Sequence, residues 1–190
     1  DGITGLFDKA RRALEYFLDE RVLADGTMKF DWDDSVQISC FQIFDIGEFL
    51  QAVSKYFLAT QDPSLIVDWQ PQITSMLTLL RENRQRSLDQ FPADDPRHGL
   101  LTGTFNNDVP EESQYYSNDI PVWFGLRDYA EALNIVAGTE VGSGLISEAR
   151  EIRAFADEFH QTLRASFDAA GIMRDSDGNP ITFLCAPDLT

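Results

Sequence analysis

An acidic stretch ahead of residue 119 holds the side chains best suited to chemistry in this sequence. Asp108, Glu111 and Glu112 lie close together in a polar run that predicts a loop. Carboxyl groups can donate or accept a proton when a fold brings them to a binding site. An acidic pair in a surface loop is more often only solvated. These three carboxyls are therefore candidate catalytic groups, and a purely structural interpretation stays open.

Aromatic and polar residues follow at the end of this loop. Tyr115 and Tyr116 have apolar rings with a polar edge, a combination that can stack on a ligand. Asn118 and Asp119 precede Pro121, and asparagine and aspartate are favoured helix caps. We expect at least one residue of this pair to cap a helix. The other can bond a ligand hydroxyl if the helix end lines a pocket.

Four further candidate binding residues lie outside the acidic loop. Asp45 and Glu48 are three residues apart at the start of a predicted helix, so their side chains share one face. Favourable placement of acids at a helix N-terminus explains them without a ligand. Trp123 falls within an apolar helical pattern, where core packing is the expected role. His98 lies in a predicted loop, and we expect a hydrogen-bonded structural role there in preference to catalysis.

The composition argues against several classes of function. The chain has 32 acidic and 15 basic residues and a net charge of −17, which repels phosphate backbones and anionic lipid headgroups. Nucleic acid and membrane surfaces are therefore not expected as partners. Cys40 and Cys185 form no Cys-x-x-Cys pair or Cys/His cluster, so no metal site or cofactor is predicted. No apolar run reaches the ~18 residues of a membrane-spanning helix.

The elements that must position these residues are mainly helices. With 190 residues, 43% of them hydrophobic, the chain can bury the core of a normal domain. Apolar residues recur at three- and four-residue spacing in five segments, which predicts an all-α fold. The expected helices cover residues 4–23, 42–60, a third segment that Pro71 breaks and that ends near residue 87, 119–138 and 143–171. A small β-hairpin is expected near the C-terminus, around the turn at 175–180.

The expected connections alternate between long and short, at about eighteen, two, thirty and five residues. Short links are typical of antiparallel helix hairpins, and irregular loops above about 15 residues are usually functional or disordered. All long connections then leave the stack at the same end. A toroid of hairpins builds its binding face in this way, with the second and fourth helices inside. An α-solenoid would also stack hairpins, but no repeated motif is visible.

Two segments resemble the six-hairpin glycosidases, a superfamily that includes glucoamylases, glycogen-debranching enzymes, trehalases and maltose phosphorylases. Residues 98–137 contain His-Gly-Leu-Leu-Thr-Gly-Thr-Phe and then Tyr-Tyr-Ser-Asn-Asp-Ile-Pro-Val-Trp-Phe-Gly-Leu at the start of an apolar helix. Residues 45–63 resemble the superfamily's inner helix and the turn that follows it. The resemblance implies an (α/α)6 ring. Residues 1–190 are expected to form about half of it, as one partial domain with at most half of an active site.

Glycosidic-bond chemistry is what this resemblance implies. One carboxylic acid protonates the leaving oxygen, and a second carboxylate activates water or acts as the nucleophile. In the disaccharide phosphorylases of the superfamily, the acid is a Glu seven residues before an Asn-Asn at the inner-helix start. That spacing selects Glu111 here, with Glu112 and Asp108 as substitutes. This sequence departs from the pattern because Glu112, and not an aromatic residue, follows Glu111.

The resemblance also implies partners and leaves two alternatives open. The partners are an oligo- or polysaccharide substrate, whose pyranose ring Tyr115, Tyr116 and Trp123 would stack on, and the remaining half of the toroid. One alternative is a non-catalytic carbohydrate-binding or scaffold toroid. Another is a polysaccharide lyase or sugar epimerase, in which a Tyr or His base abstracts a proton. A fold alone does not choose among these functions.

Overall fold

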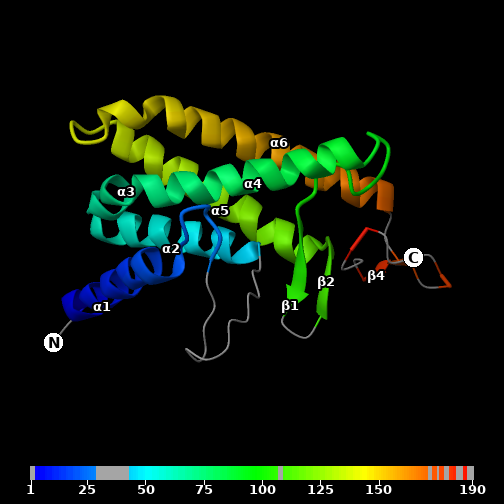
Figure 1. The fold of residues 1–190 in the computed structure, drawn as a ribbon, viewed down its shortest axis with the longest axis horizontal. Helices are drawn as coiled ribbons and strands as arrows, with labels where there is room; N and C mark the ends of the chain where they lie inside the picture. Colours follow the sequence, from blue (N-terminus) through cyan, green and yellow to red (C-terminus); the bar gives the residue numbers. More distant parts are fainter. Residues whose placement is uncertain are drawn as a thin grey trace.

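The computed structural model describes residues 3–28, 43–106, 109–170, 173–174, 176–177, 180–182 and 186–187. This part of the chain is mostly helical and carries two separate two-stranded antiparallel sheets (Figure 1). Asp108 and both cysteines lie outside the described residues, and of Glu111 only the backbone is described. The prediction of a mainly helical chain is confirmed, and more of the chain is strand than the sequence predicted.

Helices make up most of the described part of the chain. They are α1 (Ile3–Tyr16), α2 (Phe44–Thr60), α3 (Ser64–Asp68), α4 (Gln70–Gln90), α5 (Tyr116–Ala137) and α6 (Ile146–Ala170). A π-helical turn, Phe17–Arg21, extends α1, and a 3-10 turn, Ser143–Leu145, leads into α6. The five helices predicted from the sequence are confirmed. The break at Pro71 is also confirmed, because this residue lies in the first turn of α4, where its missing N–H removes no helical hydrogen bond.

The long connection between α4 and α5 contains a β-hairpin that the sequence did not predict. Strand β1 (Thr102–Asn106) pairs antiparallel with β2 (Val109–Gln114), and Thr104 stands opposite Glu112. These strands are polar and lack the apolar alternation that marks a half-buried strand. The expectation of an irregular loop here is therefore wrong. The small C-terminal hairpin is confirmed, as β3 (Met173–Arg174) pairs with β4 (Pro180–Thr182).

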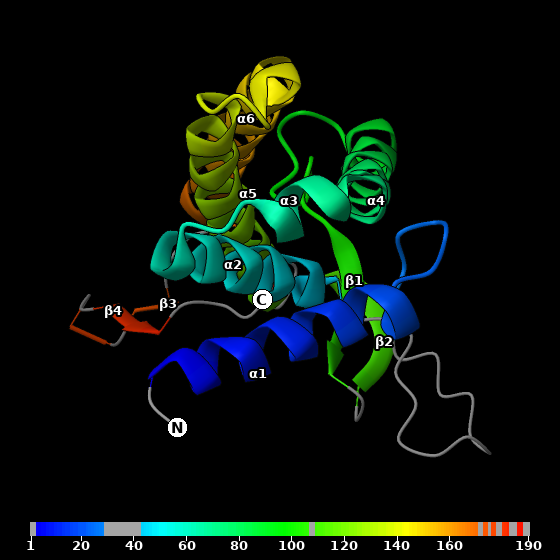
Figure 2. The same ribbon diagram turned by 90° about the vertical axis from the view of Figure 1, so that its left-hand side faces the viewer.

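The helices run in two directions along the long axis of the molecule. In Figure 1, α2 and α5 run from the end that carries β1 and β2 toward the opposite end, and α4 and α6 run back. The links after α2 and after α5 lie at the opposite end, and the connection from α4 to α5 lies at the end that carries the hairpin. Figure 2 shows α1 on the side of α2 that faces away from α6. The starts of α2 and α5 therefore lie beside the hairpin.

Two glycines let α2 and α5 cross with their backbones in contact. A Cβ atom on Gly47 would lie 2.4 Å from the carbonyl carbon and oxygen of Pro121, and one on Gly125 would lie 2.3 Å from the carbonyl oxygen of Gly47. Such distances leave no space for any side chain. The two helix starts are thus held together by the smallest residue at both crossing positions.

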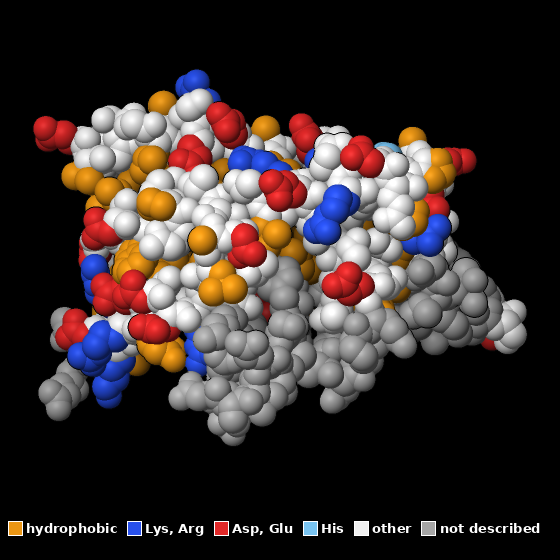
Figure 3. All heavy atoms as spheres, viewed as in Figure 1, with side chains coloured by type: hydrophobic (Ala, Val, Ile, Leu, Met, Phe, Trp, Pro, Cys, Tyr) orange, Lys and Arg blue, Asp and Glu red, His pale blue; other side chains and the backbone are white. Residues whose placement is uncertain are grey.

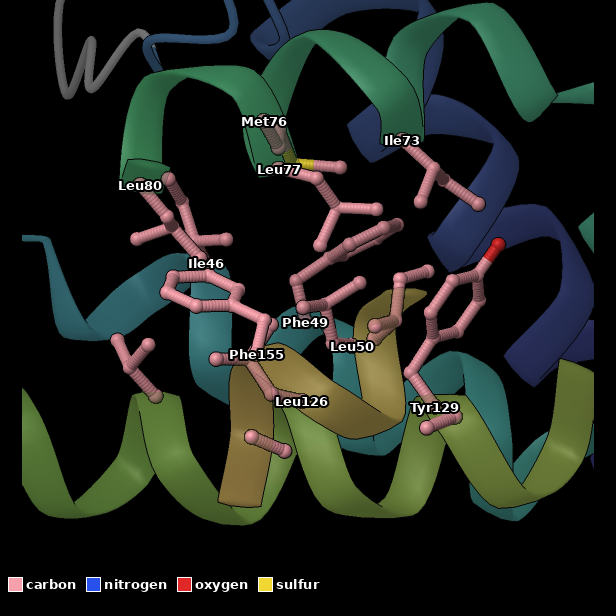
Figure 4. Close-up of a cluster of buried hydrophobic side chains, with 14 of the residues drawn as sticks. Ile46, Phe49, Leu50, Ile73, Met76, Leu77, Leu80, Leu126, Tyr129 and Phe155 are labelled. Carbon is pink, nitrogen blue, oxygen red and sulfur yellow. The ribbon is translucent and has the colours of Figure 1, made fainter. Parts of the chain in front are cut away.

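A single apolar cluster fills the space between α4 and the crossing pair (Figure 4). The side chains that point into it come from α2, α4, α5 and α6, and include Ile46, Phe49, Leu50, Ile73, Met76, Leu77, Leu80, Leu126, Tyr129 and Phe155. All of these are fully or almost fully buried. Helices that bury apolar residues on several faces, as α2 and α5 do, are typical of the centre of a helical fold.

On the face seen in Figure 3, charged side chains do not gather into a patch of one sign. Asp and Glu side chains are spread over that face, and Arg and Lys side chains lie among them. This distribution is typical of a charged surface that keeps a protein in solution. Among the described residues, no helix has the length and hydropathy that crossing a membrane requires.

Candidate functional site

Two side chains from neighbouring helices, together with one from β2, hold the base of the β1–β2 hairpin. The amide of Asn83, on α4, donates to the Thr102 carbonyl over 2.9 Å and accepts from the Thr102 N–H over 2.8 Å. Gln114 donates through Nε2 to the Thr102 hydroxyl over 2.7 Å. Asp119, on α5, accepts the Leu101 N–H through Oδ1 over 2.8 Å. The hairpin is therefore fixed to two helices at the point where it begins.

Asn118 and Asp119 do not cap α5, so that expectation is wrong. The helix begins at Tyr116, and the N–H groups of Asn118 and Asp119 both point at the Tyr115 carbonyl as part of the first turn. Both side chains are fully buried. The reason is tertiary, since Asp119 bonds the Leu101 backbone and the Asn118 amide lies against Gly103. A side chain that contacts residues distant in sequence in this way is not available to cap its own helix.

Burial changes the pKa of Asp119 and leaves polar atoms of Asn118 and Asp119 without a partner among the described residues. Desolvation raises the pKa of Asp119 well above its ordinary value, and the hydrogen bond from Leu101 only partly offsets this. Its Oδ2 atom and both polar atoms of the Asn118 amide have no hydrogen-bond partner among the described residues. Asp119 is therefore favoured in its neutral form.

Asp45 is a second carboxyl with a strongly shifted pKa. It lies in the first turn of α2, half-buried, and its Oδ2 atom has no hydrogen-bond partner in the described part of the chain. Burial and, second, the negative charge of Glu48 raise the pKa of Asp45 to about 7. Glu48 itself is exposed. The predicted proximity of the two carboxyls is consistent with this electrostatic coupling, and Asp45 can carry a proton at neutral pH.

Tyr116 belongs to the core and not to an open stacking platform. Its ring is buried and stacks on Phe167 of α6 with 4.2 Å between ring centroids. Its hydroxyl is 2.7 Å from the Ser166 hydroxyl. Tyr116 therefore has a packing role in this structure, because the helix starts early enough to turn this residue inward. Tyr115, one residue before the helix, is half-buried.

Trp123 and His160 form a contact that the sequence did not predict. Trp123 packs against the core, as expected, and its ring stacks face to face on the His160 ring at 4.4 Å between centroids. His160 is half-buried on α6. Arg127 lies 5.6 Å from the Trp123 centroid. The Trp123–His160 stack joins α5 to α6.

His98 has the hydrogen-bonded structural role that the sequence predicted. Its Nδ1 atom is 2.7 Å from the Phe91 carbonyl oxygen, and because a carbonyl only accepts, Nδ1 carries the proton. The ring also lines a groove of about 400 Å³ between α4, α6 and residues 93–98. Neither Asp45 nor Asp119 lines this groove.

The acidic loop candidates are placed only in part. Glu112 is exposed on β2, and the backbone of Glu111 precedes it in the same strand. Asp108 lies outside the described residues. A group of at least three His, Cys, Asp or Glu side chains able to hold a metal ion is not found in the described part. The raised pKa of Asp45 could not be predicted from the sequence, because it depends on burial by elements that are distant in sequence.

Replacing Tyr116 by phenylalanine is expected to lower the free energy of unfolding by about 1–2 kcal/mol, since it leaves the buried Ser166 hydroxyl without its partner. Urea denaturation measures this change. Tyr16, which is exposed on α1, provides the matched control, and Tyr16→Phe is expected to change stability by less than about 0.5 kcal/mol. An unchanged stability in Tyr116→Phe would contradict the structural role.

Comparison with protein-family models, with curated proteins and with solved structures found no match to this chain. Its function is therefore argued from its own residues. The arrangement brings the starts of α2 and α5, the base of the β1–β2 hairpin, and the carboxyls of Asp45 and Glu48 to one end of the molecule. That end is the candidate functional site.

Proposed function

We propose that this chain is part of a carbohydrate-processing enzyme built as an α/α toroid, and that it hydrolyses glycosidic bonds at the end where α2 and α5 begin. The arrangement of the helices supports this proposal. Two central helices, α2 and α5, run in the same direction and begin beside the β1–β2 hairpin, and α4 and α6 return outside them (Figure 1). The resemblance of residues 45–63 and 98–137 to six-hairpin glycosidases points to the same end.

The observation that carries the proposal is the raised pKa of the half-buried Asp45 carboxyl at the start of α2. Glycoside hydrolysis needs one carboxylic acid that stays protonated near neutral pH and a second group that stays ionised. With its pKa raised to about 7, Asp45 meets the first requirement. Glu48 and the hairpin residues Glu111 and Glu112 supply candidate second carboxylates. The resemblance selects Glu111 as the proton donor, and the geometry adds Asp45 as its competitor for that role.

Further hairpins of the toroid are the proposed partners of this chain, together with a saccharide substrate. Ile120 and Ile135 on α5, and Val141 and Ile146 at the link to α6, are large apolar residues that remain exposed. In a closed ring, neighbouring hairpins would cover such residues.

Two substitutions test this function in the full-length protein, assayed on a panel of glucosides and oligosaccharides. Asp45→Asn and Glu111→Gln are each expected to reduce kcat by about 100-fold or more, the range typical of losing a general acid or base. Glu82 is exposed on α4, and Glu82→Gln serves as the control with unchanged kcat. Full activity in Asp45→Asn would exclude Asp45 as the acid. Full activity in both variants would overturn the proposed catalytic roles of Asp45 and Glu111.

A non-catalytic carbohydrate-binding or scaffold role is the second candidate. It is favoured by one observation, that Tyr116, Asn118 and Asp119 are buried and serve to hold the fold. Saccharide binding without turnover of any glycoside by the wild-type protein would support this role. A lyase or epimerase is less favoured, because burial raises the pKa of Tyr116 and the Phe91 carbonyl engages His98.

A further inference from the structure

The start of strand β1 contacts α4, α5 and Ile43, the residue that precedes α2. Asn83 of α4 bonds both backbone groups of Thr102, and Asp119 of α5 accepts the N–H of the preceding residue, Leu101. A Cβ atom on Gly103 would lie 2.9 Å from the Asn118 Nδ2 atom and 2.9 Å from the Ile43 Cγ2 atom, next to the start of α2. In chain order, Leu101 thus meets α5, Thr102 meets α4, and Gly103 meets α5 and Ile43, the residue before α2.

The register of the hairpin connects this attachment of β1 to β2, the strand that carries the acidic residues. Thr102 stands opposite Gln114 and Thr104 stands opposite Glu112, so fixing the start of β1 also fixes β2. The Gln114 side chain strengthens the link by bonding the Thr102 hydroxyl. The position of β2, the strand that carries Glu112, relative to Asp45 therefore depends on the bonds made at Leu101 and Thr102.

We infer that Asp119 is a positioning residue, whose buried carboxyl holds the base of the β1–β2 hairpin through the Leu101 N–H and so sets where Glu111 and Glu112 stand. The catalytic part of this inference rests on the proposed function. The structural part does not, because the hydrogen bond from Leu101 and the full burial of Asp119 are properties of the fold itself.

Asparagine is the informative replacement for Asp119. Burial favours the neutral carboxyl, and an asparagine amide has the same shape, keeps Oδ1 as the acceptor and carries no charge. Alanine removes the acceptor and leaves the buried Leu101 N–H without a partner. A role in positioning therefore predicts loss in Asp119→Ala and rescue in Asp119→Asn.

Hydrogen exchange of the Leu101 amide, measured by NMR on the full-length protein, tests the structural part. Exchange is expected to accelerate about tenfold or more in Asp119→Ala and to stay within about threefold of wild type in Asp119→Asn, as expected for loss or retention of one buried hydrogen bond. Asp128 lies on the same helix and pairs with its neighbour Arg127, so Asp128→Ala is the matched control with unchanged exchange at Leu101.

The catalytic part is tested by kcat of the same variants on whichever glycoside the wild type hydrolyses. Asp119→Ala is expected to lower kcat at least tenfold and Asp119→Asn to restore it, with KM changed less than kcat. Normal Leu101 exchange in Asp119→Ala would overturn the inference even if hydrolysis is found. If wild type hydrolyses no glycoside but Leu101 exchange responds as expected, the proposed function fails and the structural role of Asp119 stands. If Asp119→Ala does not fold, slow exchange and wild-type kcat in Asp119→Asn support the inference, and their loss overturns it.

Discussion

Replacing Gly47 by alanine is expected to lower the free energy of unfolding by about 3 kcal/mol or more, at the upper end of what overpacking usually costs. The added methyl group would lie 2.4 Å from the backbone of Pro121. No side-chain rotation relieves that contact, so α2 and α5 would have to separate and disturb the core they share. Guanidinium denaturation monitored by circular dichroism measures the loss.

Gly5 provides the matched control for this prediction. It also lies in a helix, α1, and a Cβ atom built on it meets no described atom within 4 Å. Gly5→Ala is expected to leave stability unchanged or to raise it by up to about 1 kcal/mol, because alanine is the better helix former. Equal effects in the two variants would show that helix propensity, and not the crossing of α2 and α5, decides the outcome.

The second large effect concerns the pH dependence of stability that Asp45 creates. Its pKa is about 7 in the folded protein and near the ordinary value of 3.8 when unfolded. Between these values the unfolded chain loses a proton that the folded chain keeps, so rising pH favours unfolding. At about 1.4 kcal/mol per pH unit, this group is expected to remove roughly 2–4 kcal/mol of stability between pH 4 and pH 8.

Asp45→Asn removes that dependence, so its stability relative to wild type is expected to rise by the same amount over this pH range. Urea denaturation at several pH values measures the difference. Asp68, exposed at the end of α3, provides a control that also removes one negative charge, and Asp68→Asn is expected to show no such rise. Parallel pH curves for wild type and Asp45→Asn would contradict the raised pKa. Asp119 acts in the same direction, because burial raises its pKa as well.

Much of the candidate site was predictable from its residue types, but the roles within it were not. The sequence identified Asp45, Glu48, Asn118 and Asp119 as polar residues near two helix starts. It predicted that at least one of Asn118 and Asp119 caps the helix, which is a local role decided by neighbours in sequence. The structure assigns them to contacts with Leu101 and Gly103, which are distant in sequence and meet them only in the folded chain.

The helices were determined by the sequence itself. The spacing of apolar residues and the position of Pro71 act within a few residues, so the amino-acid pattern alone locates α1, α2, α4, α5 and α6. The alternation of long and short connections also indicated which helix ends lie together. These features depend on local periodicity and chain length, which a sequence states directly.

Tertiary structure alone decided the raised pKa of Asp45 and the form of the loop before α5. Burial raises the pKa of Asp45 to about 7, and burial is set by how α2 packs with the rest of the chain. The β1–β2 hairpin forms from polar strands held by Asn83 and Asp119, side chains that come from two different helices. Desolvation and cross-fold hydrogen bonds arise only when distant segments meet, so no local pattern could indicate them.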